Sequence, residues 1–144
     1  AMERGKFIHQ LLQYLPTVPV DKWDTVIKKL KPEHIEVPFR IKELIQSPQF
    51  KTIFGPNSLA EVPIVGVWKN RAISGRMDRL VILPDEVWII DFKTNQKVPK
   101  NITTVPQLYQ EQLAAYQGLT LQLFPQKKIR KFLLWTQDLS LMEL

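Results

Sequence analysis

Apolar residues recur every three or four positions near the start of the chain, in the stretch GKFIHQLLQYLP. They occupy positions i, i+3, i+4 and i+7 of one helical face, so the pattern predicts an amphipathic helix that ends at Pro16. These residues are Ile8, Leu11, Leu12 and Leu15. A second helix is expected over VDKWDTVIKKL, and prolines divide the next region into short helical pieces around 40–46 and 48–53.

The pattern changes after the turn FGPNS, where runs rich in Val, Ile and Trp replace the helical periodicity. Turns at Lys69-Asn70 and Pro84-Asp85 divide these runs, which predicts three antiparallel strands. Their expected ranges are 59–69, 72–83 and 86–94.

A polar loop, a long helix and further strands complete the chain. The helix is expected over 106–124, a fourth strand over 128–136 and a short fifth strand over 138–144. This order predicts an α/β fold, in which a mixed sheet with an antiparallel three-stranded meander is flanked by helices.

Charged residues interrupt two of the most apolar strands, in the stretch GRMDRLVILPDEVWIIDFKTN. If Pro84-Asp85 is a two-residue hairpin loop, Asp78 lies opposite Asp91, and Lys93 shares the face of Asp91. Carboxylates directly opposite each other have Cβ atoms about 4.5–5.5 Å apart and destabilise the sheet. Their repulsion therefore has to be offset by a cation.

Two kinds of cation can offset this repulsion. A divalent ion such as Mg²⁺ or Mn²⁺ suits a pair of carboxylate ligands, and this is the interpretation that we favour. The alternative is a buried salt-bridge cluster in which Arg79 or Lys93 supplies the positive charge. The strand pattern by itself leaves both open.

The composition narrows the classes of site and partner. Twenty Lys and Arg against 14 Asp and Glu give a formal net charge of +6, which suits a polyanionic partner such as nucleic acid. Six basic residues either contact phosphates or form a solvated face, and the sequence does not separate the two: Lys97, Lys100, Lys127, Lys128, Arg130 and Lys131. The absence of cysteine excludes disulfides, thiolate zinc sites and iron–sulfur clusters. No apolar run approaches the roughly 20 residues of a membrane span.

Five short motifs together resemble one known family. GRMDRLV, IIDFKT and QEQLAAYQ, preceded by GKFIHQLL and EVPIVG, are similar to the motifs of the PD-(D/E)XK nuclease superfamily. The resemblance is greatest to the RecB-like branch and to the C-terminal nuclease domain of AddA-type helicase–nucleases. It covers nearly the whole chain and implies a restriction-endonuclease-like core, with residues 1–144 forming a single nuclease domain cut from a larger helicase–nuclease.

The resemblance also implies a role for each residue of the motifs. Mg²⁺ or Mn²⁺ would be bound by side chains and one backbone carbonyl: His9, Asp78, Asp91 and the carbonyl of Phe92. Lys93 would be the catalytic lysine, and Gln112 and Tyr116 would border the active site and contact the DNA. The role of Glu61, in the EVP segment, is left open. The family often has glutamate where this chain has Asp91.

The implied function is that of a Mg²⁺-dependent deoxyribonuclease, exonuclease or endonuclease, in double-strand break repair and recombination. It would cut single-stranded DNA fed by a helicase motor in the parent chain, beside an AddB-type partner subunit, in the bacterial cytoplasm at the nucleoid. Two other functions stay open, namely a catalytically idle DNA-binding or docking module and a stand-alone resolvase or restriction-type endonuclease. The complete Asp78, Asp91 and Lys93 set argues against the idle module.

Overall fold

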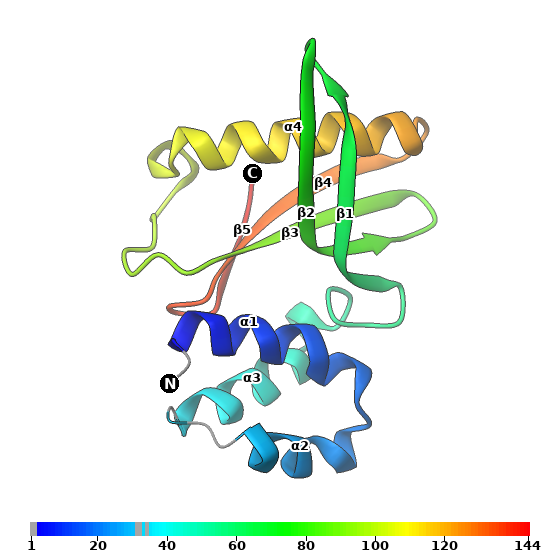
Figure 1. Ribbon diagram of the computed structural model, residues 1–144. Helices are drawn as coiled ribbons and strands as arrows, with labels where there is room; N and C mark the ends of the chain where they lie inside the picture. The colour runs from blue at the N-terminus through cyan, green and yellow to red at the C-terminus, as the bar shows by residue number, and fades with distance from the viewer. Residues whose placement is uncertain (1–2, 31–32, 34) are drawn as a thin grey trace. The chain divides into compact units, whose positions relative to one another are not determined.

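The helices expected at the start of the chain are present in the computed structural model, which describes residues 3–30, 33 and 35–144 (Figure 1). They form the first of two units, which divide between Pro56 and Asn57. Its helices are α1 (Arg4–Tyr14), α2 (Trp23–Leu30) and α3 (Glu36–Gln46), with 3₁₀ turns at Leu15–Thr17, Val20–Lys22 and Pro48–Phe50. Within this unit α1 packs against α3.

The third helix is longer than the sequence pattern predicted. It begins at Glu36, whereas we expected a helical piece around 40–46. The pattern predicts a break at Pro38, but this proline lies in the first turn of α3. The N–H groups of a first turn make no hydrogen bond within the helix, so a proline costs none there. The piece expected around 48–53 is the 3₁₀ turn Pro48–Phe50 followed by further turn residues.

The second unit contains the sheet, and its strands lie close to the predicted ranges. They are β1 (Ser58–Trp68), β2 (Arg71–Ile82), β3 (Glu86–Lys93), β4 (Lys128–Trp135) and β5 (Ser140–Glu143). A 3₁₀ turn (Ile102–Thr104) and the helix α4 (Gln107–Leu123) lie between β3 and β4. The predicted α/β class, the mixed sheet and its antiparallel meander are therefore confirmed.

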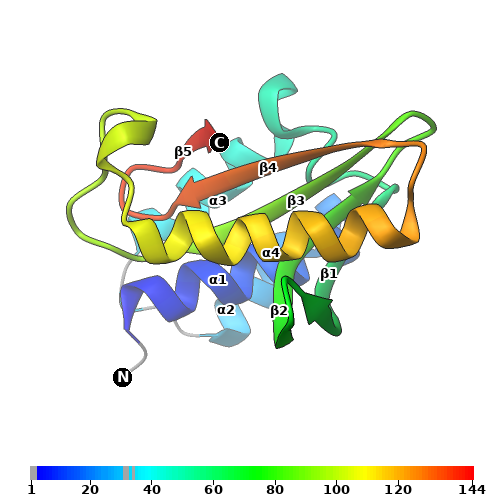
Figure 2. The same cartoon turned by 90° about the horizontal axis from the view of Figure 1, so that it is seen from above.

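The five strands lie in sequence order, β1-β2-β3-β4-β5. Every neighbouring pair is antiparallel except β3 and β4, which are parallel and are joined through α4. Lys69 and Asn70 form the turn between β1 and β2 with φ of 49° and 61°, the left-handed conformation that a tight hairpin turn requires. Figure 2 shows α4 lying over the sheet.

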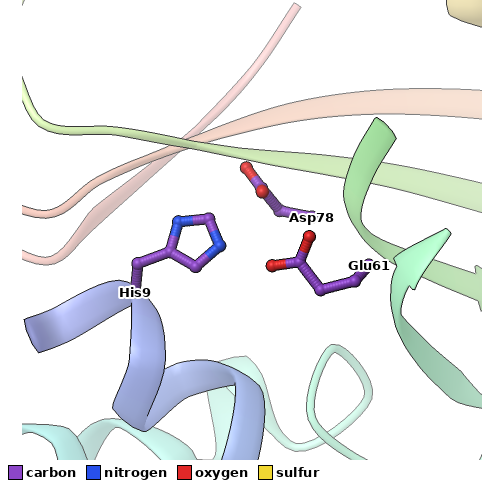
Figure 3. A group of neighbouring side chains, drawn as sticks. All are labelled: His9, Glu61 and Asp78. Carbon is purple, nitrogen blue, oxygen red and sulfur yellow. The ribbon is translucent and has the colours of Figure 1, made fainter. Parts of the chain in front are cut away.

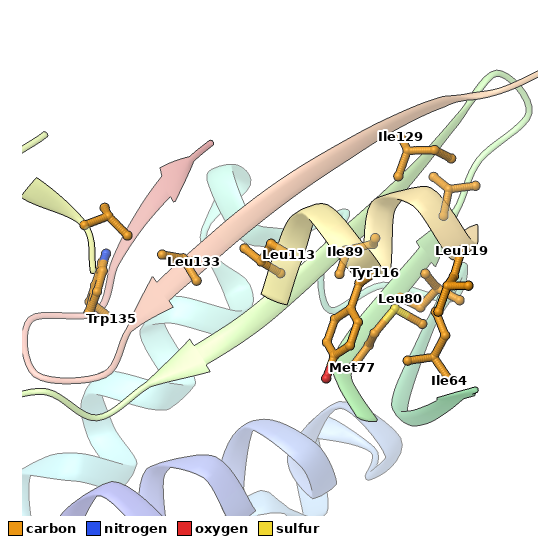
Figure 4. Packing of buried hydrophobic residues seen from close by; sticks show 12 residues of the cluster. Ile64, Met77, Leu80, Ile89, Leu113, Tyr116, Leu119, Ile129, Leu133 and Trp135 are labelled. Carbon is orange, nitrogen blue, oxygen red and sulfur yellow. The ribbon is translucent and has the colours of Figure 1, made fainter. Parts of the chain in front are cut away.

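The face of the sheet under α4 is an apolar core (Figure 4). Leu113, Tyr116 and Leu119 of α4 belong to the same buried cluster as Met77 and Leu80 of β2. In a regular strand, residues three apart point to opposite faces. Met77 and Leu80 nevertheless belong to the same cluster, so β2 changes the face that it presents to α4 between them. Asp78 lies at this change.

No helix among the described residues combines the length and the apolar character that crossing a membrane requires.

Candidate active site

The register of the β2–β3 hairpin places two carboxylates at the end of its ladder. Leu80 pairs with Ile89, and the ladder ends where Arg79 pairs with Ile90, as a two-residue loop at Pro84-Asp85 predicts. Continued by one position, the same register would bring Asp78 opposite Asp91. There the backbone pairing gives way to a side-chain contact, because the Phe92 N–H donates to Asp78 Oδ2 at 2.6 Å.

A third carboxylate lies on the other side of Asp78. In the β1–β2 ladder Ala60 pairs with Arg79 and Val62 with Met77, which leaves Glu61 facing Asp78. Glu61 has a φ of 53°, and one of its carboxylate oxygens lies within 4.8 Å of an oxygen of Asp78 (Figure 3). Glu61, Asp78 and Asp91 thus form a row across three adjacent strands.

The electrostatics of this row favour a bound proton or cation. Burial raises the pKa of the Asp78 carboxyl to about 8, and its hydrogen bond with Asp91 and the charge of Asp91 act in the same direction. The charge of Glu61 also raises this pKa, whereas the Phe92 N–H opposes the shift. A proton held between Asp78 and Asp91 therefore offsets their repulsion when no metal is bound.

Lys93 supplies positive charge beside the second carboxylate of the pair. Its Nζ lies 2.8 Å from Asp91 Oδ2. Asp91 Oδ2 is buried and accepts no hydrogen bond of good geometry from the described residues, so this ion pair is its compensation. Of the two cations considered from the sequence, Arg79 instead donates from Nε to Ser58 Oγ at 2.7 Å.

Helix α4 connects to Lys93 through the two residues of the QxxxY motif. Lys93 Nζ donates to Gln112 Oε1 at 3.4 Å, and Gln112 Nε2 donates to the Tyr116 hydroxyl at 3.3 Å. Tyr116 is buried against Gly75 of β2, where an added Cβ would lie 2.0 Å from the hydroxyl. Gly75 therefore allows the close approach of β2 and α4 that brings these three side chains into one chain of hydrogen bonds.

Tyr109 is a site residue that the sequence analysis missed. Lys93 Nζ lies 4.0 Å from the centroid of its ring, a cation–π contact that helps to hold the ammonium group. The Tyr109 hydroxyl donates to Asn95 Oδ1 at 2.9 Å. The signal was present in the spacing, because Tyr109 precedes Gln112 by three residues and so shares its helix face.

His9 lies on α1, in the first unit, and follows the buried Ile8 in the sequence. Glu61 and Asp78 lie in the second unit. The role of His9 as a metal ligand stays a prediction, which rests on the GKFIHQLL motif.

Comparison with known families gives one match over most of the chain. The family model of the PD-(D/E)XK nuclease superfamily matches residues 6–140. No curated protein matches the chain. A solved structure, described as the crystal structure of SSO0001, is similar at 15% identity and a TM-score of 0.40, covering 99% of this chain and 78% of that one.

Proposed function

This chain belongs to the PD-(D/E)XK nuclease superfamily, and from this membership we propose that it is a divalent-metal-dependent deoxyribonuclease that hydrolyses single-stranded DNA. The observation that carries the proposal is the set of charges where β2 and β3 diverge. The carboxyl groups of Asp78 and Asp91 are hydrogen-bonded there, and the Lys93 ammonium lies 2.8 Å from Asp91. Phosphodiester hydrolysis needs a cation on the phosphate oxygens and a group that orients or activates water, and this set can supply both.

The donor atoms of this set suit a hard divalent cation. Carboxylate and carbonyl oxygens are the ligands that Mg²⁺ and Mn²⁺ prefer. The row offers the carboxylates of Asp78 and Asp91, and burial together with the charge of Asp91 raises the pKa of Asp78. In our proposal Asp78, Asp91 and the carbonyl of Phe92 would hold the ion, and His9 would add a nitrogen ligand. The bound ion would act as a Lewis acid on the phosphate and lower the pKa of its water.

Lys93 has a separate role in this proposal. Its ammonium group is held by Asp91, by Gln112 and by the ring of Tyr109, so its position is fixed before substrate arrives. A fixed charge of this kind stabilises the negative charge that develops on the phosphate, or orients the attacking water. Gln112 and Tyr116 would position Lys93 and contact the scissile strand.

Glu61 has a place in the same row, and its role can now be proposed. Its carboxylate pairs with Arg76, whose Nη1 lies 3.5 Å from Glu61 Oε2. We expect Glu61 to hold a water of the metal ion, because it lies beside Asp78 but on the opposite side from Lys93.

The wider role is proposed from the motif resemblance. Residues 1–144 would act as one nuclease domain of a larger helicase–nuclease in double-strand break repair. A helicase motor in the parent chain would supply the single strand, and an AddB-type subunit would be the partner, in the bacterial cytoplasm at the nucleoid. The prediction for this role is that a strand fed by such a motor is cut faster than free DNA.

A gel assay of cleavage tests the proposed activity. Labelled single-stranded DNA should be cut with Mg²⁺ or Mn²⁺ and should stay intact with chelator or with Asp78→Asn. The matched control is Glu86→Gln, which removes a carboxylate at the other end of β3 and should cut at the wild-type rate. A folded wild-type protein that binds DNA but never cuts it would contradict the proposal and favour the idle module.

A further inference from the structure

A groove of about 650 Å³ extends from Lys93 to the tip of the β1–β2 hairpin, entirely within the second unit. Residues at the end of the hairpin, among them Trp68 and Arg71, line one side of it. Residues in the first half of α4, among them Ala114 and Ala115, line the other side. The groove therefore joins the candidate active site to a part of the hairpin that the catalytic proposal does not use.

The hairpin end of this groove carries two exposed cations, Lys69 and Arg71. Neither has an acidic partner among the residues that the structure describes. One acidic residue, Glu111, lines the groove from α4. With Lys93 at the far end, cations lie at both ends of the groove, as a bound polyanion requires.

Aromatic rings lie beside these cations at both ends. The Trp68 ring is half-buried and packs on Gly118 of α4, where an added Cβ would lie 2.2 Å from the ring. This contact fixes the ring, while its remaining exposed surface lines the groove. Tyr109 provides a second half-buried ring next to Lys93.

Fixed rings that alternate with cations are typical of surfaces that bind single-stranded nucleic acid. Unpaired bases stack on the rings, and the cations contact the backbone. Bases in a duplex already stack on one another, so a duplex gains little from such rings. We propose that this groove binds the single strand that leads into the active site, with one base stacked on Trp68 and phosphates bound by Lys69 and Arg71. The inference rests on the proposed nuclease function, whose substrate path it defines.

Binding of labelled oligo(dT) with chelator present tests the groove without cleavage. Trp68→Ala should weaken binding about 5-fold or more, which corresponds to the loss of one stacked base, and Trp68→Phe should restore most of it. An oligonucleotide of equal length with abasic sites should bind wild type and Trp68→Ala alike, because it has no base to stack. Blunt duplex should likewise be insensitive to Trp68.

The exposed cations provide a second test, which uses the salt dependence of binding. Lys69 also contacts Trp68, with its Nζ 5.4 Å from the centroid of the ring. The Lys69→Ala, Arg71→Ala double variant should lower the slope of log affinity against log salt by about 1.4, or about 0.7 per phosphate contact. The matched control is Lys128→Ala, an exposed cation on β4 that does not line the groove, and it should leave affinity unchanged.

Two results would overturn the groove assignment. Equal losses from Lys128→Ala and from the hairpin variant would mean that DNA binds over the whole basic surface. A Trp68→Ala defect as large on abasic DNA as on oligo(dT) would mean that Trp68 is structural. Either result is compatible with metal-dependent cleavage by wild type, so failure of the groove and failure of the nuclease function are distinguishable.

Discussion

Strand β3 carries a cluster of charges at each end, and the two clusters are built differently. At its start Glu86 lies 3.3 Å from Arg130 of β4, and Arg130 also makes two hydrogen bonds of 2.8 and 2.7 Å to Glu143 of β5. At its end Asp91 and Lys93 meet Asp78 of β2. In the first cluster one cation contacts both carboxylates. In the second, three carboxylates form a row, with Arg76 beside Glu61 at one end and Lys93 beside Asp91 at the other.

The pKa shifts of the two clusters run in opposite directions. Hydrogen bonds to Trp88 and Arg130 lower the pKa of Glu86, and those to Arg130 lower the pKa of Glu143, so both carboxyls stay charged. Burial and the neighbouring Asp91 raise the pKa of Asp78 to about 8. The Arg130 cluster is thus complete as an ionic network, while the Asp78 cluster still favours an additional positive charge.

This difference separates a structural ion network from a site prepared for a ligand. The Arg130 guanidinium is further held near the rings of Trp88 and Phe132, at 5.0 and 5.1 Å from their centroids. The guanidinium thus has two carboxylate partners and two ring contacts, as is typical of a structural ion network. A buried carboxylate pair that costs stability is retained most simply for function, as active sites commonly trade stability for activity.

The largest effect is expected from Lys93→Ala, on the rate of cleavage. The rate should fall about 10²–10³-fold, because one fixed charge at a developing oxyanion is lost. Lys93→Arg should also be poor, since its charge is placed differently. Single-turnover cleavage measures the loss, with Arg130→Gln as the cation control that keeps its rate. A Lys93→Ala rate near that of wild type would make Lys93 a structural residue like Arg130.

Metal binding should stabilise the protein through the Asp78 cluster alone. At about 100 times its dissociation constant, Mn²⁺ or Mg²⁺ should add about 2.7 kcal/mol to the free energy of unfolding. Asp78→Asn should remove most of this gain and Glu86→Gln should keep it, as thermal melts with and without metal would reveal. Equal gains in both variants would place the ion elsewhere.

The pH dependence of the metal-free protein should have opposite signs for the two clusters. The folded pKa of Asp78 is raised from 3.8 to about 8, so its stabilising contribution is fully present below about pH 4 and is lost as the pH rises through 8. Glu86 and Glu143 have lowered pKa values, so their contributions are lost as the pH falls. Urea unfolding from pH 5 to 9 with chelator should show a loss that Asp78→Asn flattens. If Asp78→Asn loses as much stability as wild type between pH 5 and 9, other groups cause the loss.

The smallest effect is expected from Glu143→Gln. Its ion pair with Arg130 is largely exposed, so the free energy of unfolding should fall by less than about 1 kcal/mol. Cleavage should be unchanged. A large loss of activity in this variant would mean that the two ends of β3 are coupled and would break the comparison.

The sheet was predictable in detail because local chemistry sets its register. The loop at Pro84-Asp85 has two residues, which fixes every pair along β2 and β3 up to Arg79 and Ile90. The two-residue turn at Lys69-Asn70, together with the apolar runs on either side, likewise fixes the pairing of β1 with β2. The full length of α3 was not predicted, because a proline usually ends a helix. Pro38 is compatible with α3 because it lies in the first turn.

The site was predictable only in part, because it depends on departures from regular structure. The β1–β2 register places Glu61 opposite Asp78, but its φ of 53° is a departure from strand geometry that the sequence pattern does not predict. Tyr109 is brought under Lys93 by packing of α4 on the sheet, a contact between segments distant in sequence. Lys93 rather than Arg79 contacts Asp91, since Arg79 pairs with Ile90 and therefore lies on the face of the sheet opposite to Asp91.

Diffraction from crystals soaked in Mn²⁺ tests the central claim most directly. We expect an anomalous peak within about 2.0–2.6 Å of carboxylate oxygens of both Asp78 and Asp91, with the Phe92 carbonyl also in reach and no peak at Glu86 or Glu143. Binding of the ion should displace the proton held between Asp78 and Asp91. The contradicting result is well-ordered density that has no anomalous peak at saturating Mn²⁺. Asp91 would then still be paired with Lys93 and hydrogen-bonded to Asp78, and the site would be a buried salt-bridge cluster.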